Sequence, residues 1–222
     1  ILPYLKEHSV DSLEACNMLW IYQSKRSRFY ESALILLSLA TSNFDIELTK
    51  RIEYLSRANG FSKSMCSPNE RSKMIKLSSD IKEIFEVAEI QDEILKMVEN
   101  DSRLKAESDS KEVGKPGKNK VTVQSKMVSQ LNNKILSVSE LFNDYAEPLE
   151  YYEICLLIFQ ISDFRVREEI IKKWKQLFVS IQQTQQNDSN PNDLKYLLSN
   201  LMVSLGKKLY TNDFVFPVGE LI

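Results

Sequence analysis

The sequence predicts an all-α protein, an irregular α-solenoid of stacked antiparallel helices that includes one long helical hairpin. Apolar residues recur at steps of three and four over most of the chain, which is the spacing of a helix that buries one face. No β-branched run alternates with polar residues as a half-buried strand would. The 6 prolines fall at or near the ends of the helical patterns. Because the helices follow no fixed sequence period, an irregular stack is favoured over a regular repeat array.

Each expected helix is bounded by the ends of its apolar pattern. The expected helices cover Val10–Gln23, Arg28–Thr41, Asp45–Ser62, Asn69–Asn100, Gln124–Tyr145, Pro148–Ser162, Phe164–Gln185 and Pro191–Tyr210. Proline suits the first turn of a helix because that turn does not need its N–H group. This role fits Pro68, Pro148, Pro191 and Pro217. At the start of the third helix, Asn43 or Asp45 is expected to be the cap, because a short oxygen-bearing side chain accepts from free N–H groups.

The helices at 69–100 and 124–145 carry heptad-like apolar stripes that suit near-parallel packing. A polar segment joins them, so we expect an antiparallel hairpin. The alternative is an intermolecular coiled coil. Two features weigh against it: each stripe is short, and residues 87–97 carry a second apolar stripe.

Residues 103–122 are predicted to be a flexible loop inserted into a single helical segment that spans residues 1–222. Their Lys, Ser, Gly and Glu content buries too little apolar area to offset the entropy of ordering. We expect limited proteolysis to cut there first and deletion of the loop to leave the fold intact. A weakly basic site for nucleic acid or modification is the alternative for residues 99–126, which contain no aromatic residue to stack on bases.

The last three helices are predicted to form a packed group. The helix at 148–162 is apolar nearly all round, which places it in the centre. On the next helix, Trp174 is expected to be a core residue that links it to the helix at 148–162. The final helix carries Leu201, Leu205 and Leu209 on one face, and we expect this face to be left partly uncovered.

Composition weighs against several classes of protein. The chain has 222 residues, 43% hydrophobic, with a net charge of −2, whereas a nucleic-acid-binding domain normally has a basic excess. The longest apolar stretch, Ile154–Ile161, is far too short to span a bilayer. The chain starts at Ile1 without a signal-peptide pattern and ends within an apolar pattern at residues 220–222. We therefore expect a segment of a longer protein.

Catalytic chemistry is not expected, and no catalytic, cofactor-binding or metal-binding residue is assigned. The only histidine, His8, is interpreted as a surface residue. The widely spaced Cys16, Cys66 and Cys155 indicate reduced thiols rather than a disulfide framework or a zinc knuckle. The carboxylate pairs Glu168-Glu169 and Asp92-Glu93 are attributed to solvated helix faces. The glycines of Gly114–Asn119 do not have phosphate-loop spacing.

Two motifs carry a family resemblance. The first is RIEYLSRA at Arg51–Ala58, which follows a leucine-rich helix at residues 34–40. The second is LFNDYAEP at Leu141–Pro148, which is followed by EICL at Glu153–Leu156. In this order and at this distance, they resemble the C-terminal helical domain of the large inner-ring scaffold nucleoporins of the nuclear pore complex, above all the fungal members. The resemblance covers roughly Leu19 to Val215, and residues 99–126 depart from it.

The resemblance implies a structural component of the pore at the nuclear envelope that supports nucleocytoplasmic transport. It implies other nucleoporins as partners, especially short segments of disordered linker nucleoporins, without a small-molecule substrate, nucleic acid or membrane insertion by this segment. The sequence does not assign the partner-binding residues, and the helices from Pro191 onward are our preferred location. The alternatives are an α-solenoid adaptor or tether of a vesicle-coat assembly, and an all-α enzyme with a polar cluster in a cleft.

Overall fold

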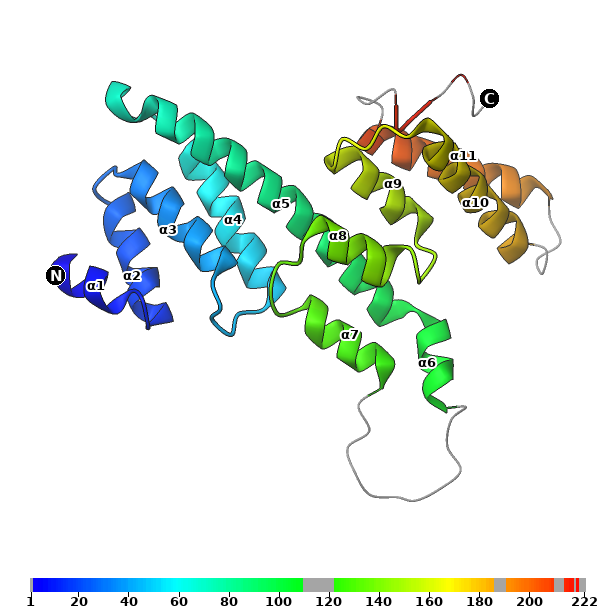
Figure 1. The fold of residues 1–222 in the computed structure, drawn as a ribbon, viewed down its shortest axis with the longest axis horizontal. Coiled ribbons are helices and arrows are strands. Elements are labelled where there is room, and N and C mark those ends of the chain that lie inside the picture. Colours follow the sequence, from blue (N-terminus) through cyan, green and yellow to red (C-terminus); the bar gives the residue numbers. More distant parts are fainter. Residues whose placement is uncertain (1, 110–121, 186–190, 210–213, 218, 220–222) are drawn as a thin grey trace, which may run out of the picture. The chain divides into compact units, whose positions relative to one another are not determined.

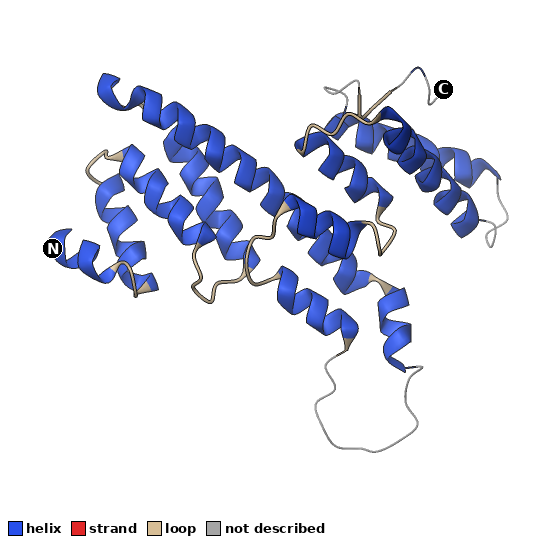
Figure 2. Ribbon diagram, viewed as in Figure 1, coloured by secondary structure: helices blue, strands red, loops and turns tan. Residues whose placement is uncertain are grey.

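The computed structural model describes residues 2–109, 122–185, 191–209, 214–217 and 219. These residues form helices and loops without a β-strand, which confirms the predicted all-α class (Figure 2). The chain divides into two compact units, Ile1–Leu136 and Ser137–Ile222. We describe each unit by itself, and one continuous stack over residues 1–222 stays a prediction.

The N-terminal unit is a series of helices in which successive members pack against each other. In chain order they are α1 (Leu2–His8), α2 (Leu13–Ser24), α3 (Phe29–Thr41), α4 (Leu48–Ser62), the 3-10 turn η1 (Pro68–Glu70), α5 (Arg71–Asn100), α6 (Ser102–Asp109) and α7 (Val123–Leu131) (Figure 1). Each of α1 to α4 packs on the next helix, and α7 packs on α5 as the predicted hairpin requires. The core between α2, α3, α4 and α5 is apolar and includes Leu36, Leu39, Leu55 and Ile81.

The first predicted helix begins later than expected. Val10 lies outside α2, which starts at Leu13 because the Ser12 side chain accepts a hydrogen bond from the Ala15 N–H. The short helix α1 was not predicted, and only one of its residues, Leu5, is buried. A single buried side chain leaves too weak a periodic signal to predict a helix.

The predicted cap of α4 is wrong. Glu47 occupies the cap position without a side-chain hydrogen bond, and neither Asn43 nor Asp45 serves there. Instead, the Leu48 N–H donates to the backbone oxygen (3.0 Å) and side-chain Oδ1 (3.1 Å) of Asn132. A residue 84 positions away in sequence therefore satisfies the start of the helix.

Two buried polar side chains explain why the predicted helix at 124–145 is broken. Gln91 Nε2 donates to the carbonyls of Leu131 (2.6 Å) and Lys134 (2.8 Å), and its Oε1 accepts from the Leu136 N–H (2.8 Å). Arg51 donates to the Asn133 carbonyl at 2.6 Å. These bonds use backbone groups that a continuous helix would pair internally, so α7 ends at Leu131.

Arg51 also holds the turn between α3 and α4. Its guanidinium donates to backbone oxygens of Ala40 (2.8 Å), Ser42 (2.8 Å), Phe44 (2.8 Å) and Ile46 (3.1 Å). The side chain is 1% exposed, and burial lowers its pKa while Asp45 raises it. Arginine suits this position because its planar group carries five donors in fixed directions.

The predicted loop at 103–122 is shorter at its start. Residues 102–109 form α6, where Leu104 is buried. At the other end, Thr122 caps α7 by accepting from the Ser125 N–H at 3.1 Å. Residues 110–121 lie outside the described residues, so their flexibility and dispensability stay predictions.

The C-terminal unit is arranged around α9. Its elements are α8 (Val138–Glu140), the π-helix η2 (Leu141–Ala146), α9 (Tyr152–Ile161), α10 (Arg167–Gln185) and α11 (Pro191–Leu209). The continuous run Ile154–Phe159 is buried, and η2, α10 and α11 all pack on α9. This confirms the predicted central helix, and α11 begins at Pro191 as expected.

Two helices in this unit start later in the chain than predicted. Pro148 lies in a turn rather than in the first turn of α9, and Glu150 after it has a positive φ of 60°. Asp163 has a φ of 50°, so the chain reverses there and α10 starts only at Arg167. Single left-handed residues of this kind end a helical pattern. Their apolar neighbours still pack: the Phe164 and Phe159 rings stack with centroids 4.5 Å apart.

Candidate functional site

The candidate catalytic residues weighed from the sequence, His8 and the two carboxylate pairs, are dispersed over the described residues. His8 stacks on Tyr4 with ring centroids 4.1 Å apart and is exposed, as predicted. The two carboxylate pairs lie on helices, where Asp92 pairs with Lys96 and Glu169 pairs with Lys172. Gly114–Asn119 lies outside the described residues. In the part of the chain that is described, no group of three His, Cys, Asp or Glu residues could hold a metal ion.

None of the described helices is both long and apolar enough to cross a membrane. Several aromatic residues of the N-terminal unit are used in packing. Trp20 contacts Phe61 at 6.3 Å between ring centroids, and its Nε1 donates to Asn17 Oδ1 at 3.1 Å. The same Asn17 oxygen accepts from the Tyr54 hydroxyl at 3.0 Å. These contacts show that Trp20, Phe61 and Tyr54 help to pack the N-terminal unit.

A buried titratable group in the C-terminal unit was not foreseen from sequence. Lys173 is buried, donates to Glu147, and lies 5.7 Å from the centre of the Tyr152 ring. The Cys155 thiol also donates to Glu147, at 3.8 Å. The Lys173–Glu147 pair ties α10 to the turn before α9. Because the Lys173 ammonium is bonded to Glu147 and the Cys155 thiol is buried, this cluster supports packing rather than nucleophilic chemistry.

Cys66 is expected to react first with a thiol reagent. It is partly exposed, whereas Cys16 and Cys155 are buried. Burial raises the pKa of Cys155 to about 12 and also raises the pKa of Cys16. Because the thiolate is the nucleophile, both buried thiols should stay unreactive at about pH 8. Mass spectrometry after brief iodoacetamide treatment should find Cys66 labelled, and the others labelled only in denaturant. Rapid native labelling of Cys155 would contradict this.

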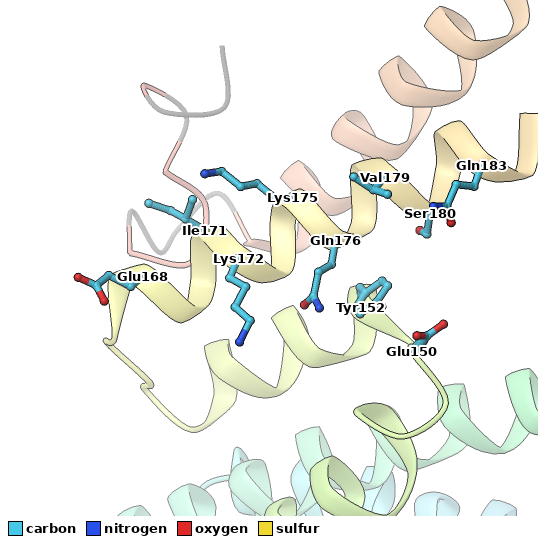
Figure 3. A pocket seen from close by; sticks show the side chains of 10 residues that line it. All are labelled: Glu150, Tyr152, Glu168, Ile171, Lys172, Lys175, Gln176, Val179, Ser180 and Gln183. Atoms are coloured by element: carbon cyan, nitrogen blue, oxygen red, sulfur yellow. The ribbon is translucent and has the colours of Figure 1, made fainter. Parts of the chain in front are cut away.

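Two concavities in the C-terminal unit lie along α10. The first has a volume of about 700 Å³ and is formed by α10 and the start of α9 (Figure 3). It is lined by Glu150, Tyr152, Glu168, Ile171, Lys172, Lys175, Gln176, Val179, Ser180 and Gln183. The second has a volume of about 450 Å³ and involves α9, α10 and α11. It is lined by Glu153, Ser180, Ile181, Leu197, Asn200, Leu201 and Ser204.

The two concavities form one surface, which we call the α10 groove. Ser180 lines both, and the neighbouring residues Tyr152 and Glu153 each line one. The part between α10 and α11 is the more apolar, because Ile181, Leu197 and Leu201 contribute to it. The part beside α9 mixes apolar, amide and charged side chains.

Gln176 is the polar group in this groove whose bonding is incomplete. Its side chain points from α10 toward Tyr152 at the start of α9 (Figure 3). The Gln176 Oε1 atom is buried and accepts no hydrogen bond from the described part of the chain. A buried carbonyl oxygen without a donor is destabilising, so an incoming N–H group would be favourable there.

The prediction that one face of α11 is left partly uncovered is wrong for two of its three leucines. Leu205 and Leu209 are buried, and Leu201 is half-buried in the α10 groove. Helix α11 packs on α9 and α10, and residues 214–217 return to it at Gly206. Phe216 lies 3.5 Å from where a Cβ on Gly206 would be, so the glycine allows its close approach.

The helix preferred from the sequence contributes to the groove, although its role in partner binding stays a prediction. Residues from Pro191 onward contribute Leu197 and Leu201, yet more of the lining comes from α10. Glu168 is attributed to a solvated face from the sequence, yet it lines the groove together with Lys172 and Lys175. The available signal was Ile171 and Val179 within that face, since apolar residues on a charged stripe indicate a partly covered surface.

Comparison with known families gives a match over the whole chain. Residues 1–222 match the family described as non-repetitive/WGA-negative nucleoporin C-terminal. The chain belongs to this family. Nucleoporin NUP170 of Saccharomyces cerevisiae is 44% identical over 224 residues, which cover 100% of the chain and 14% of that protein. A nucleoporin of Schizosaccharomyces pombe is 33% identical over 228 residues, covering 100% of the chain and 16% of the relative.

Solved structures of this nucleoporin family share the fold. A crystal structure of the Chaetomium thermophilum Nup170 C-terminal domain has a TM-score of 0.86 at 26% identity, covering 99% of this chain and 41% of that one. The same domain in complex with Nup145N has a TM-score of 0.81 at 27% identity, covering 99% and 42%. The resemblance to fungal scaffold nucleoporins and the helical solenoid fold are thereby confirmed. The chain spans about one seventh of the length of the yeast relative.

Proposed function

We propose that this chain is part of a structural scaffold of the nuclear pore complex and that it binds other nucleoporins at the nuclear envelope. The observation that carries the proposal is the match of the entire chain to the Nup170 C-terminal domain, one structure of which is a complex with Nup145N. Support for a vesicle-coat adaptor or tether is weaker, because the relatives described above are nucleoporins.

The proposed role is non-enzymatic. Among the buried polar groups of the described residues, Arg51 and Gln91 make bonds that hold loops and Lys173 pairs with Glu147, whereas most ion pairs lie on helix surfaces. Such an arrangement gives shape and surface rather than a set of reacting groups. A stack of helices exposes grooves along its length, and these accept short peptide segments.

The partner we propose is a short segment of a disordered linker nucleoporin. Such a segment must be ordered when it binds, and this cost lowers its affinity relative to the area that it buries. We therefore expect modest affinity for one segment. Several segments acting together in an assembled pore would strengthen the attachment by raising their effective concentration.

Calorimetry with peptides that tile Chaetomium thermophilum Nup145N tests this role. We expect at least one peptide to bind the 222-residue chain with a dissociation constant of about micromolar to high nanomolar. The control is a peptide of the same composition in scrambled order, which should not bind. If none of the tiled peptides bound, the proposed linker partner would be wrong.

A further inference from the structure

We infer that the α10 groove is the docking site for the nucleoporin segment, which lies extended along α10 with an apolar anchor between α10 and α11. This inference rests on the proposed function and adds the location and chemistry of the site. It is carried by three observations: the continuity of the two concavities at Ser180, the incomplete bonding of Gln176, and the charge of the lining.

The dimensions fit a short extended peptide. The α10 residues of the groove run from Glu168 to Gln183, a rise of roughly 22 Å at about 1.5 Å per residue. An extended chain covers this length with about seven residues at roughly 3.3 Å each. A segment of that length can be supplied by a disordered linker without a folded domain of its own.

The anchor site is apolar and open. Leu197 is 42% exposed although it lines the part between α10 and α11, and Ile181 and Leu201 beside it are half-buried. An apolar side chain placed among these three would remove more of their surface from water, which is the main source of peptide affinity in such grooves. Val179, which is 48% exposed, adds an apolar side chain to the lining of the first concavity.

Gln176 supplies a contact to the peptide backbone. Its buried Oε1 accepts no hydrogen bond from the described chain, and an extended segment presents N–H groups at regular intervals. Because the oxygen is closed off from solvent, the Gln176 side chain must turn outward into the groove before one of these groups can donate to it. A backbone contact of this kind fixes the position of a segment without demanding a particular side chain, which suits recognition of a linker.

The charges of the groove select against strongly charged ligands. The lining contains Glu150, Glu153 and Glu168 against Lys172 and Lys175, so the two signs nearly balance. A nucleic-acid strand would require a basic track and stacking aromatic residues. The matching occupant is a segment of low net charge with apolar anchors.

Charge substitutions on α11 provide a matched test. Leu197→Glu should weaken binding of the calorimetrically active Nup145N peptide at least about tenfold, because it places a carboxylate where the anchor would be desolvated. The controls are Tyr196→Glu and Val203→Glu on the same helix, where the side chains are 68% and 57% exposed and do not line the groove. Both should stay within about threefold of the unchanged chain.

A photoreactive amino acid at position 179 gives a second readout that does not depend on stability. It should cross-link to the bound peptide, and the same group at position 203 should not. Circular dichroism melting curves check that every variant is folded. Equal peptide affinity in Leu197→Glu and the control variants, with no cross-link from position 179, would overturn the groove assignment while leaving the proposed function intact.

Failure of the unchanged chain to bind any Nup145N peptide would instead count against the proposed function. Sedimentation at several concentrations distinguishes a second copy of the chain as occupant. Self-association that Leu197→Glu abolishes, with peptide binding unaffected, would also overturn the inference. Binding of a single-stranded oligonucleotide that competes with the peptide would contradict the argument from charge.

Discussion

Replacing Arg51 by methionine is expected to lower the free energy of unfolding of the N-terminal unit by about 3–5 kcal/mol. The guanidinium donates to five backbone oxygens, from Ala40, Ser42, Phe44, Ile46 and Asn133. Methionine keeps much of the side-chain volume but donates no hydrogen bond, so these buried carbonyls lose their donor. Removing a buried charge offsets part of this loss, because its desolvation cost disappears.

The matched control is Arg57→Met on the same helix. Arg57 is about half exposed and pairs with Glu53, so its loss should change stability by less than about 1 kcal/mol. Arg51→Lys should recover only part of the stability, because one ammonium group cannot reach carbonyls arranged around a planar fork. Urea unfolding followed by Trp20 fluorescence, in a Trp174→Phe background, measures all three variants. Equal losses for Arg51→Met and Arg57→Met would show that the carbonyl cage is not stabilising.

The helices themselves could be predicted because their apolar spacing is local. The sequence sufficed for α3 and α11, whose predicted starts agree with the structure to within one residue. The role of Arg51 could not be predicted in the same way, because one of its acceptors is 82 residues away. Gln91 is a second example. In the sequence it is a polar residue within an apolar stripe, but this pattern does not show that its side chain holds the loop at 132–136.

The candidate groove was less predictable than the fold for a related reason. Its lining is drawn from three helices, and each helix supplies ordinary surface residues whose importance depends on their neighbours. Helical periodicity separates a buried face from an exposed one but does not show where two exposed faces meet. Gln176 illustrates this, since its incomplete bonding becomes visible only when Tyr152 is placed opposite it.

Trp174→Ala is expected to destabilise the C-terminal unit by about 3–5 kcal/mol, through lost burial and an unfilled cavity. Trp174 is fully buried, as predicted from the sequence. Its ring lies 5.7 Å from that of Phe178 and 5.6 Å from that of Phe216 between centroids, and its Nε1 donates to the Val215 carbonyl at 2.9 Å. These contacts join α10 to the segment at 214–217, and the predicted link from Trp174 to α9 stays a prediction.

The contacts of Trp174 give its substitution a second consequence, beyond the loss of stability. Without the indole, residues 214–217 lose both the ring contact and the hydrogen bond, so their backbone amides should exchange hydrogen faster than before. Trp174→Phe keeps an aromatic ring but leaves the Val215 carbonyl without this donor, and should cost less than alanine. Val179→Ala, at an exposed position of the same helix, is the control and should change stability by less than about 1 kcal/mol. Unfolding curves and hydrogen exchange on these variants separate the two effects. If Trp174→Ala destabilised the unit while exchange at 214–217 stayed unchanged, Trp174 would fill the core without anchoring this segment.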